Sequence, residues 1–351
     1  MGLPNTMSNY DLSILIPARN EEWLAQTVED LLKNKRGRTE ILVGLDGYWP
    51  NPGVPDHDDV TILYEPVSIG QRAMQNKLAK ISKAKYVMKA DAHTMWDEGF
   101  DTKMISKMED DITMVPRMFN LHVFNWVCKS CGMQWYQGPK PTACRNETCD
   151  SISWTADNNP NYATNFEKHL VWHPRGNGCL NGGNCHPDRP NPRSSAYRFN
   201  KNLQFKYFPE LGGKTPQTGL QETMSLQGSC FLCTRENYWK KELCDESWGS
   251  WGQQGSEVAI KTWLSGGRVL CNFDTWYAHL FRTQSGFSFP YPHSGKSQQR
   301  AREISQDIFL NNKWTQQKYK LGWLLKKFWF ALKEVKDPDA KWEESDLEKY
   351  D

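Results

Sequence analysis

An acidic and an imidazole side chain stand two positions apart at the end of an apolar run. Asp91-Ala92-His93 directly follows Tyr86–Ala90, and a carboxylate and an imidazole at this spacing can converge on one divalent cation. A diphosphate can complete the coordination sphere of such a cation. The same triplet also arises by chance, with the histidine as an ordinary hydrogen-bonded loop residue. The triplet alone leaves both interpretations open.

Four cysteines form a second candidate metal site. Cys128-x2-Cys131 is followed, after twelve residues, by Cys144-x4-Cys149. Two cysteine pairs at this distance suit tetrahedral zinc, although the second pair is spaced more widely than the common two residues. We expect a closed structural Zn2+ site that organises a small ribbon and does no chemistry.

A further group of histidines and cysteines follows the four cysteines. Its members are His169, His173, Cys179, Cys185 and His186. Four of them, with His173, Cys179, Cys185 and His186 as the preferred set, can hold a second zinc ion. The alternative is a scatter of surface residues in a loop rich in Gly, Asn and Pro.

The elements that must position Asp91 and His93 alternate between strands and helices. Apolar runs predict strands at Leu12–Pro17, Glu40–Leu45, Val60–Tyr64 and Tyr86–Ala90, and helical periodicity predicts helices over residues 22–33 and 70–83. This alternation is typical of an α/β protein with a parallel sheet covered by helices. Ligands of such sheets bind beyond the carboxyl ends of the strands, where Asp46 and Asp91 both fall.

Composition excludes some classes of protein. The chain has 351 residues, which suggests about two domains, and its 43 Lys and Arg nearly balance its 41 Asp and Glu. A mean hydropathy of −0.73 and the lack of an apolar run of about 18 residues argue against a membrane span. Without a secretion signal, we expect a cytoplasmic protein, in the host cytoplasm if it is viral, with cysteines as thiols or metal ligands.

The charges are segregated along the chain. Residues 120–215 hold 11 basic and 6 acidic side chains, and residues 296–336 hold 10 basic and 3 acidic ones. The remaining segments are acidic overall, so the near-neutral total hides two basic modules. Residues 313–334 predict a basic aromatic helix that packs its apolar face on the core. A membrane-surface helix and a platform for an anionic polymer are the alternatives.

Several short motifs resemble, in order, those of nucleotide-diphospho-sugar glycosyltransferases of the GT-A type, and within them the polypeptide N-acetylgalactosaminyltransferases. Asp91-Ala92-His93 has the form of that family's metal motif. The other similar stretches are Ile16–Glu21, Tyr197–Pro209, Gln227–Phe231, Trp251–Glu257, Ala278–Arg282 and Phe287–Pro290. The resemblance covers about residues 11–120 and 195–295 and implies an α/β fold of the GT-A class.

The resemblance implies roles for individual residues. Asp91, His93 and His279 are implied as ligands of Mn2+ (or Mg2+), which neutralises a departing diphosphate. A further set is implied to bind the nucleotide-sugar: Pro17, Arg19, Glu21, Asp46, Arg72, Asp91, Gly228, Ser229, Trp251, Arg282 and Phe287. Of these, Arg282 and Phe287 belong to a stretch that resembles a loop closing over the nucleotide.

The chain departs from the family at the acceptor side. A carboxylate that supports the reaction centre in the family is replaced here by Gln254, whereas Glu257 is retained. Glu257 is therefore the candidate carboxylate near the acceptor, and the alternative is a residue that complements a helix dipole. We also expect no membrane anchor and no C-terminal lectin domain, which secretory members of the family carry.

These observations predict a UDP-sugar-dependent glycosyltransferase with four segments. They are residues 1–120 (nucleotide-sugar half), 121–195 (zinc insertion), 196–295 (acceptor half) and 296–351 (basic aromatic helix and acidic tail). The basic modules favour DNA as acceptor, through the hydroxyl of a 5-hydroxymethylated pyrimidine such as hydroxymethylcytosine, as relatives in bacterial viruses suggest. Alternatives are a protein or cell-envelope polysaccharide acceptor, and a non-catalytic sugar- or nucleic-acid-binding relative.

Overall fold

The computed structural model describes residues 9–149, 165–175, 196–212, 218–282, 286, 289–291 and 295–351. The chain divides into two compact units. The first comprises Met1–Met118, Pro192–Tyr277 and Pro290–Asp351, and the second comprises Phe119–Asn191 and Ala278–Phe289. Two strands, β6 and β13, begin in the first unit and continue into the second.

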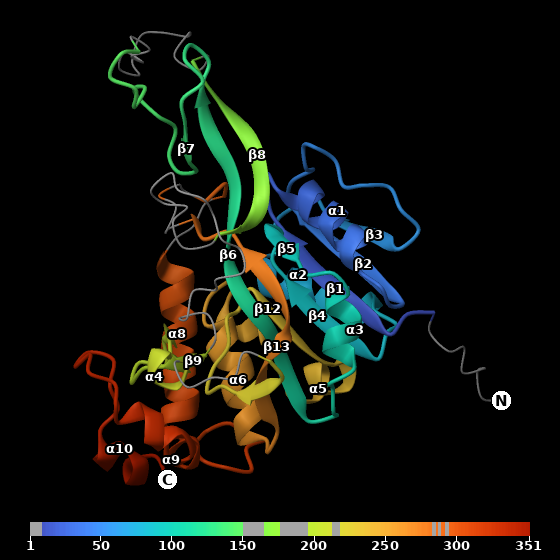
Figure 1. Cartoon of the computed structure of the whole chain (residues 1–351). Coiled ribbons are helices and arrows are strands. Elements are labelled where there is room, and N and C mark those ends of the chain that lie inside the picture. The colour runs from blue at the N-terminus through green and yellow to red at the C-terminus, as the bar shows by residue number, and fades with distance from the viewer. Residues whose placement is uncertain are drawn as a thin grey trace, which may run out of the picture. The chain divides into compact units, whose positions relative to one another are not determined.

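The first unit is built on a mixed sheet in the strand order β11-β13-β6-β12-β4-β1-β2-β3 (Figure 1). Its parallel part consists of β1 (Leu12–Ala18), β2 (Thr39–Asp46), β3 (Val60–Glu65) and β4 (Tyr86–Ala90). The rest consists of β6 (Ile112–Cys128), β11 (Leu220–Glu222), β12 (Cys230–Thr234) and β13 (Arg268–His279), and β5 (Thr94–Trp96) pairs with β13. The four predicted strands are confirmed to within one residue at each end.

Helices connect and cover these strands. They are α1 (Leu24–Asn34), α2 (Gln71–Ile81), α3 (Phe100–Ile105), α4 (Pro209–Gly212), α5 (Arg235–Lys240) and α6 (Gln254–Leu264), with a 3-10 turn η4 (Glu246–Trp248) before α6. A two-stranded hairpin joins β9 (Tyr197–Phe199) to β10 (Phe205–Tyr207). The core side chains of β1, β2 and β4 are fully or almost fully buried, as expected for strands covered on both faces.

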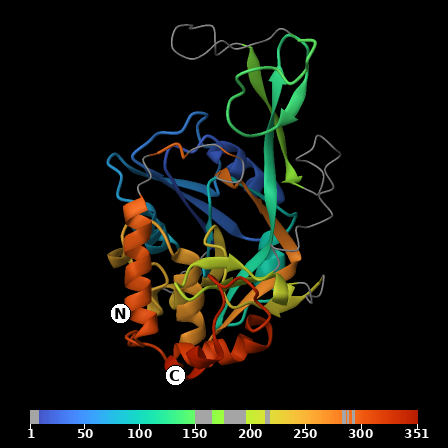
Figure 2. The ribbon, with the colours of Figure 1, turned by 90° about the vertical axis from the view of Figure 1, so that its left-hand side faces the viewer.

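The C-terminal part of the first unit is helical, with α8 (Gly295–Leu310), α9 (Leu321–Leu332) and α10 (Glu344–Lys349). Figure 2 shows α9 and α10 gathered at one end of the unit beside the C-terminus. Helix α9 buries Leu324, Leu325 and Phe328, and the Phe328 ring meets Trp263 of α6 at 5.5 Å. The packing interpretation of this segment is confirmed.

The predicted helix over 313–334 is wrong at its start. Residues 313–320 form turns, and α9 begins at Leu321 after Lys320 in an extended conformation. The aromatic residues of this turn region satisfy a helical spacing by chance. Tyr319, for example, stacks on Trp323 at 4.2 Å from outside the helix.

The described part of the second unit is an antiparallel ribbon. The second half of β6 pairs with β7 (Gln134–Tyr136) on one side and with β8 (Phe166–Arg175) on the other. The long β6–β8 pair is visible in Figure 1. A register shift between His122 and Phe124 bends this pairing.

Among the residues that the structure describes, no helix has the length and apolar character that a membrane crossing requires.

Candidate functional site

The Asp-x-His triplet lies where β4 ends. Asp91 follows the last residue of β4, and its side chain is 26% exposed. His93 is buried, and its Nδ1 lies 3.3 Å from a carboxylate oxygen of Glu21, which follows β1. A carboxylate beside the second ring nitrogen is the arrangement that orients metal-binding histidines. Asp91 and His93 therefore both lie at the carboxyl edge of the sheet, as the order of the predicted strands suggests.

His279 is the third ligand that the resemblance implies. It is the last residue of β13. This strand belongs to the first unit up to Tyr277. His279 itself therefore belongs to the second unit, and its role as a ligand beside Asp91 and His93 of the first unit stays a prediction.

A turn just before β12 lies beside Asp91. The backbone N–H of Asp91 donates to the carbonyl of Ser229 at 3.0 Å, and the Ser229 hydroxyl lies 2.8 Å from that of Tyr277. Gly228 and Gly255 allow this turn to approach the start of α6. A Cβ on Gly255 would lie 2.3 Å from the carbonyl oxygen of Leu226, which is closer than packed atoms allow.

Sequence reasoning missed Lys89, which is buried inside β4. Its ammonium forms an ion pair with Asp91 and donates to the carbonyl of Gly228 at 2.8 Å. The available signal was a charged residue within an otherwise apolar strand, Tyr86–Ala90.

Asp46 lies at the carboxyl edge of the parallel strands, as predicted, but its carboxylate is hydrogen-bonded to other residues of the protein. Its carboxylate accepts hydrogen bonds from the N–H groups of Ile69 and Gly70, at 2.6 and 3.1 Å, and from the Ser68 hydroxyl at 2.8 Å. It therefore shapes the turn that begins α2.

Arg72 and Glu257 are paired with each other. Both side chains are buried, and the guanidinium forms an ion pair with the carboxylate and donates to the carbonyl of Gly252 at 2.7 Å. Lys261 donates to the other Glu257 oxygen at 2.7 Å, as does the N–H of Asp245 at 3.2 Å. Burial opposes the charge of Arg72, but Glu257 beside it more than offsets this, so the pKa of Arg72 is raised.

This pairing differs from the sequence-based expectation of Arg72 at the nucleotide and Glu257 at the acceptor. The two residues lie 185 positions apart, and only the fold reveals that each neutralises the other. Gln254 is also buried, where it accepts a hydrogen bond from Gln71 at 2.9 Å and donates to Gln75 at 2.7 Å. In this geometry, Glu257 and Gln254 hold α6 against α2.

The remaining predicted nucleotide-sugar residues are only partly described. Pro17, Arg19 and Trp251 are partly exposed, and the backbone of Trp251 is held by the Ser297 hydroxyl at 3.2 and 3.1 Å. Arg282 is buried just after β13. Phe287 lies outside the described residues.

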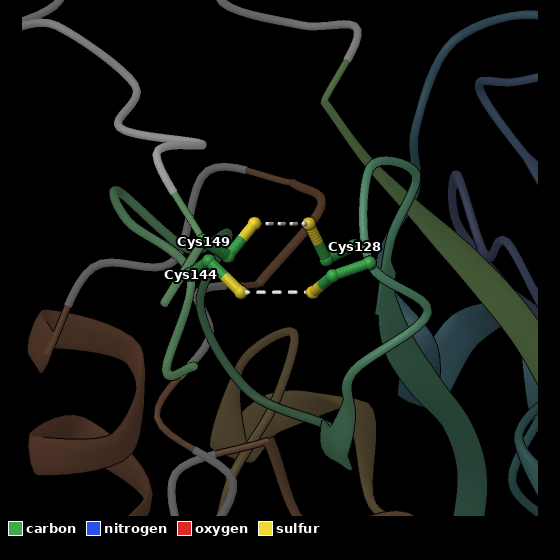
Figure 3. Close-up of side chains that lie close together, drawn as sticks. Cys128, Cys144 and Cys149 are labelled. Carbon is green, nitrogen blue, oxygen red and sulfur yellow. Dashed lines mark hydrogen bonds between the residues drawn. The ribbon is translucent and has the colours of Figure 1, made fainter. Parts of the chain in front are cut away.

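The four cysteines of the second unit lie together, and Figure 3 labels three of them, Cys128, Cys144 and Cys149. Cys128 Sγ lies 3.9 Å from Cys149 Sγ, and Cys131 Sγ lies 3.5 Å from Cys144 Sγ. These distances are too long for disulfides, and they approach the edge of about 3.8 Å expected for a tetrahedron with Zn–S bonds of about 2.3 Å. The donor set therefore fits zinc.

The second cysteine-histidine group is only partly described. His169 and His173 lie on β8, where they pair with Asn125 and His122 of β6. His169 Nε2 lies 2.7 Å from Glu167, and the His173 ring lies 5.1 Å from that of His122. Cys179, Cys185 and His186 lie outside the described residues, so a second zinc site stays a prediction.

Comparisons with known proteins agree with this architecture. Residues 13–127 match the family described as Glycosyl transferase family 2. The chain is 30% identical over 103 residues to "Probable N-acetylgalactosaminyltransferase 6" of Caenorhabditis elegans, a match over 28% of this chain and 17% of that protein. It is 27% identical over 99 residues to Polypeptide N-acetylgalactosaminyltransferase 11 of Xenopus tropicalis, over 27% of this chain and 16% of that protein. The chain thus spans less than a fifth of these relatives.

A solved structure shares the fold over most of the chain. The crystal structure of GalNAc-T7 with UDP, GalNAc and Mn2+ aligns with a TM-score of 0.53 at 15% identity, and covers 85% of this chain and 48% of that chain. The α/β sheet, the site at its carboxyl edge and these similarities lead to one conclusion. The protein has the GT-A fold, and its residues 13–127 match the model of glycosyltransferase family 2.

Proposed function

We propose that the chain is a metal-dependent glycosyltransferase that moves a sugar from a UDP-sugar to a hydroxyl group. The observation that carries this proposal is the position of Asp91 and His93 directly after the carboxyl end of β4 in a chain of GT-A fold. One carboxylate and two imidazoles suit a divalent first-row cation better than Mg2+, which prefers oxygen ligands. The structural neighbour was solved with UDP and Mn2+, which supports Mn2+ here.

In this proposal each residue of the metal site has a task. Asp91, His93 and His279 hold the cation, which when bound neutralises the charge of the departing diphosphate. Glu21 accepts a hydrogen bond from His93 Nδ1 and so fixes the tautomer that presents Nε2 to the metal. Arg282 and Phe287 are assigned to closure over the nucleotide, Pro17 and Arg19 to the nucleotide itself, and Gly228, Ser229 and Trp251 to the sugar side.

The acceptor's proton needs a base other than Glu257. Both oxygens of Glu257 are buried and engaged with cationic or N–H donors, and those of Asp46 accept three hydrogen bonds. This arrangement favours retaining transfer, in which the leaving phosphate oxygen takes the proton. The anomeric configuration of the product, determined by NMR, tests this, and an inverted product would contradict it.

For the acceptor we propose a 5-hydroxymethylated pyrimidine in DNA. The support is charge, because the described part of the second unit carries six Lys and Arg against two Asp and Glu. Three of these cations lie over aromatic rings: Lys168 over Phe124 at 4.9 Å, Arg145 over Trp135 at 5.7 Å and Arg175 over Tyr136 at 5.9 Å. Basic side chains beside aromatic rings are typical of nucleic-acid surfaces. A protein or a cell-envelope polysaccharide is the alternative acceptor.

For the four cysteines we propose a structural Zn2+. Four sulfurs that lie within 4.8 Å of one another can close the coordination sphere of a tetrahedral ion, so the ion would stabilise the loop after β6 and take no part in transfer.

The test is incubation of the purified chain with Mn2+ and a panel of UDP-sugars, with and without hydroxymethylcytosine DNA. Nucleosides and released UDP are then analysed by mass spectrometry. We expect turnover that requires the metal and is lost in His279→Ala but kept in His57→Ala, a control at an exposed histidine. No turnover of any donor would favour the non-catalytic binding alternative. Turnover with a protein or polysaccharide but not with DNA would overturn the acceptor, as would DNA binding that is absent even at low salt.

A further inference from the structure

Lys89 is a buried charge in the centre of the sheet. Its side chain is 1% exposed, and it lies on β4 between the apolar residues Met88 and Ala90. Removing an ammonium group from water is costly unless it is paired and hydrogen-bonded. A lysine in this position therefore needs a reason beyond packing.

The lysine joins two parts of the candidate site. Its ammonium binds the carboxylate of Asp91 and the carbonyl oxygen of Gly228. Asp91 belongs to the proposed metal site, and Gly228 belongs to the turn that precedes β12. One cation thus connects the metal carboxylate to the turn assigned to the donor sugar.

The sheet does not require this connection. Strands β4 and β12 are already in register through Ala90 with Cys230 and Lys89 with Phe231, and Asp91 N–H donates to the Ser229 carbonyl. An apolar side chain at position 89 would satisfy the strand equally well. The ammonium therefore serves the orientation of two polar groups, the Asp91 carboxylate and the Gly228 carbonyl.

We propose that Lys89 is a positioning residue that holds the Asp91 carboxylate and the Gly228 turn as one unit. The spacing between the Asp91 carboxylate and the Gly228 turn then stays fixed while the donor binds. This inference rests on the proposed function. It adds a residue that touches neither the metal nor the sugar and acts through Asp91 and Gly228.

The test compares Lys89→Met with Lys241→Met, since Lys241 is also buried but pairs with Asp111 at 3.9 Å, away from this network. Binding of UDP and of UDP-sugar is measured by calorimetry in the presence of Mn2+, together with KM and kcat. In Lys89→Met we expect the UDP-sugar Kd to rise about tenfold, or about 1.4 kcal/mol. The UDP Kd should stay close to that of the wild type, as should both constants in Lys241→Met.

Other outcomes would overturn the inference. If Lys89→Met weakens the binding of UDP and of UDP-sugar equally, Lys89 is a counter-ion of the metal site alone. If the binding of both ligands is unchanged, Lys89 has only a structural role. Lys89→Gln, which keeps a donor but loses the charge, serves as the second variant if Lys89→Met does not fold. If the wild type binds neither ligand, the proposed function itself fails; if the wild type turns over and the variant matches Lys241→Met, only the role of Lys89 fails.

Discussion

At the scale of single residues, a structural and a catalytic role of the Glu257 carboxylate lead to different predictions. It is fully buried between Arg72 and Lys261, so Glu257→Gln leaves two buried cations without their anion. We expect the free energy of unfolding to fall by about 3–5 kcal/mol, measured by urea denaturation. Glu246→Gln is the control, because Glu246 is exposed and its carboxylate accepts a hydrogen bond from the neutral amide of Asn76.

If Glu257 were instead a catalytic base, its substitution would change the rate of the reaction and not the stability of the protein. Glu257→Gln would then keep the wild-type unfolding curve and lose only kcat. That result would restore the acceptor role that the sequence suggests.

His122 predicts a pH dependence of the ribbon in the second unit. Burial lowers the pKa of His122 from 6.5 to about 4; the hydrogen bond with Asn125 opposes this shift, and His173 and Arg175 reinforce it. The unfolded chain therefore binds a proton that the folded chain does not, between these two values. The neutral histidine contributes stability that is fully present above pH 6.5 and is lost as the pH falls toward 4.

We expect the amides of β6 and β8 to exchange faster with solvent as the pH falls through this range, after correction for intrinsic exchange rates. The correction matters because intrinsic exchange itself changes with pH. His122→Gln should weaken this pH dependence. An NMR titration that places the pKa of His122 at or above 6.5 would contradict the prediction.

The residue scale also shows where sequence reasoning ends. Asp91 and His93 could be found because their spacing carries the chemistry within three positions. Arg72 and Glu257 could not be paired, since their contact depends on how α2 and α6 pack, and no local pattern encodes that. The contact between Lys89 and Gly228 could not be found either, because the two residues lie 139 positions apart.

At the scale of elements, the start of α6 lies in close contact with the Gly228 turn, which we assign to the donor sugar. A methyl group on Gly255 would meet the Leu226 carbonyl at 2.3 Å and the Gly228 nitrogen at 2.8 Å. Gly255→Ala should therefore displace the turn, lower the free energy of unfolding by about 1–3 kcal/mol and raise the KM for the UDP-sugar.

The control for this change is Gly53→Ala, where a Cβ would meet no atom within 4 Å. Unfolding curves and the KM for the UDP-sugar, measured on both variants, test whether Gly255→Ala displaces the turn. A Gly255→Ala protein that gains stability through helix propensity would show that the turn yields without cost.

Elements were predictable where their pattern is strong. The parallel strands β1 to β4 and helices α1 and α2 follow from apolar runs and helical spacing. The start of α9 could not be predicted from the sequence. The aromatic side chains of residues 313–320 keep a helical spacing although these residues form turns. The β6–β7–β8 ribbon was expected only as a zinc-bearing insertion, since its strands pair across segments that no local signal connects.

At the scale of the whole molecule, the two metal sites that we propose should differ in how readily they exchange their ions. A closed four-cysteine site should retain one Zn2+ per chain through dialysis against EDTA, whereas Mn2+ at the open Asp91 site should be removed. We expect a strong thiol-reactive agent to release the zinc and expose the segment around Cys131 and Cys144 to proteolysis.

Metal analysis by mass spectrometry and limited proteolysis measure these outcomes. Cys144→Ser should reproduce the proteolytic sensitivity without the agent, and Cys271→Ser, at a buried cysteine of β13 outside the cluster, serves as its control. A wild-type protein that purifies without zinc and resists the protease would contradict the assignment.

The connectivity of the second unit has a consequence for natural variation. The chain leaves the first unit after Met118 and returns at Pro192, while the register of Met114 with Leu232 lies before the departure. Because both ends of the segment Phe119–Asn191 connect to the first unit, this segment can lengthen, shrink or be exchanged among descendants without disturbing β4 and the residues Asp91 and His93 after it. Residues 119–191 are therefore free to evolve at a different rate from the residues that we propose to bind the metal, within one gene.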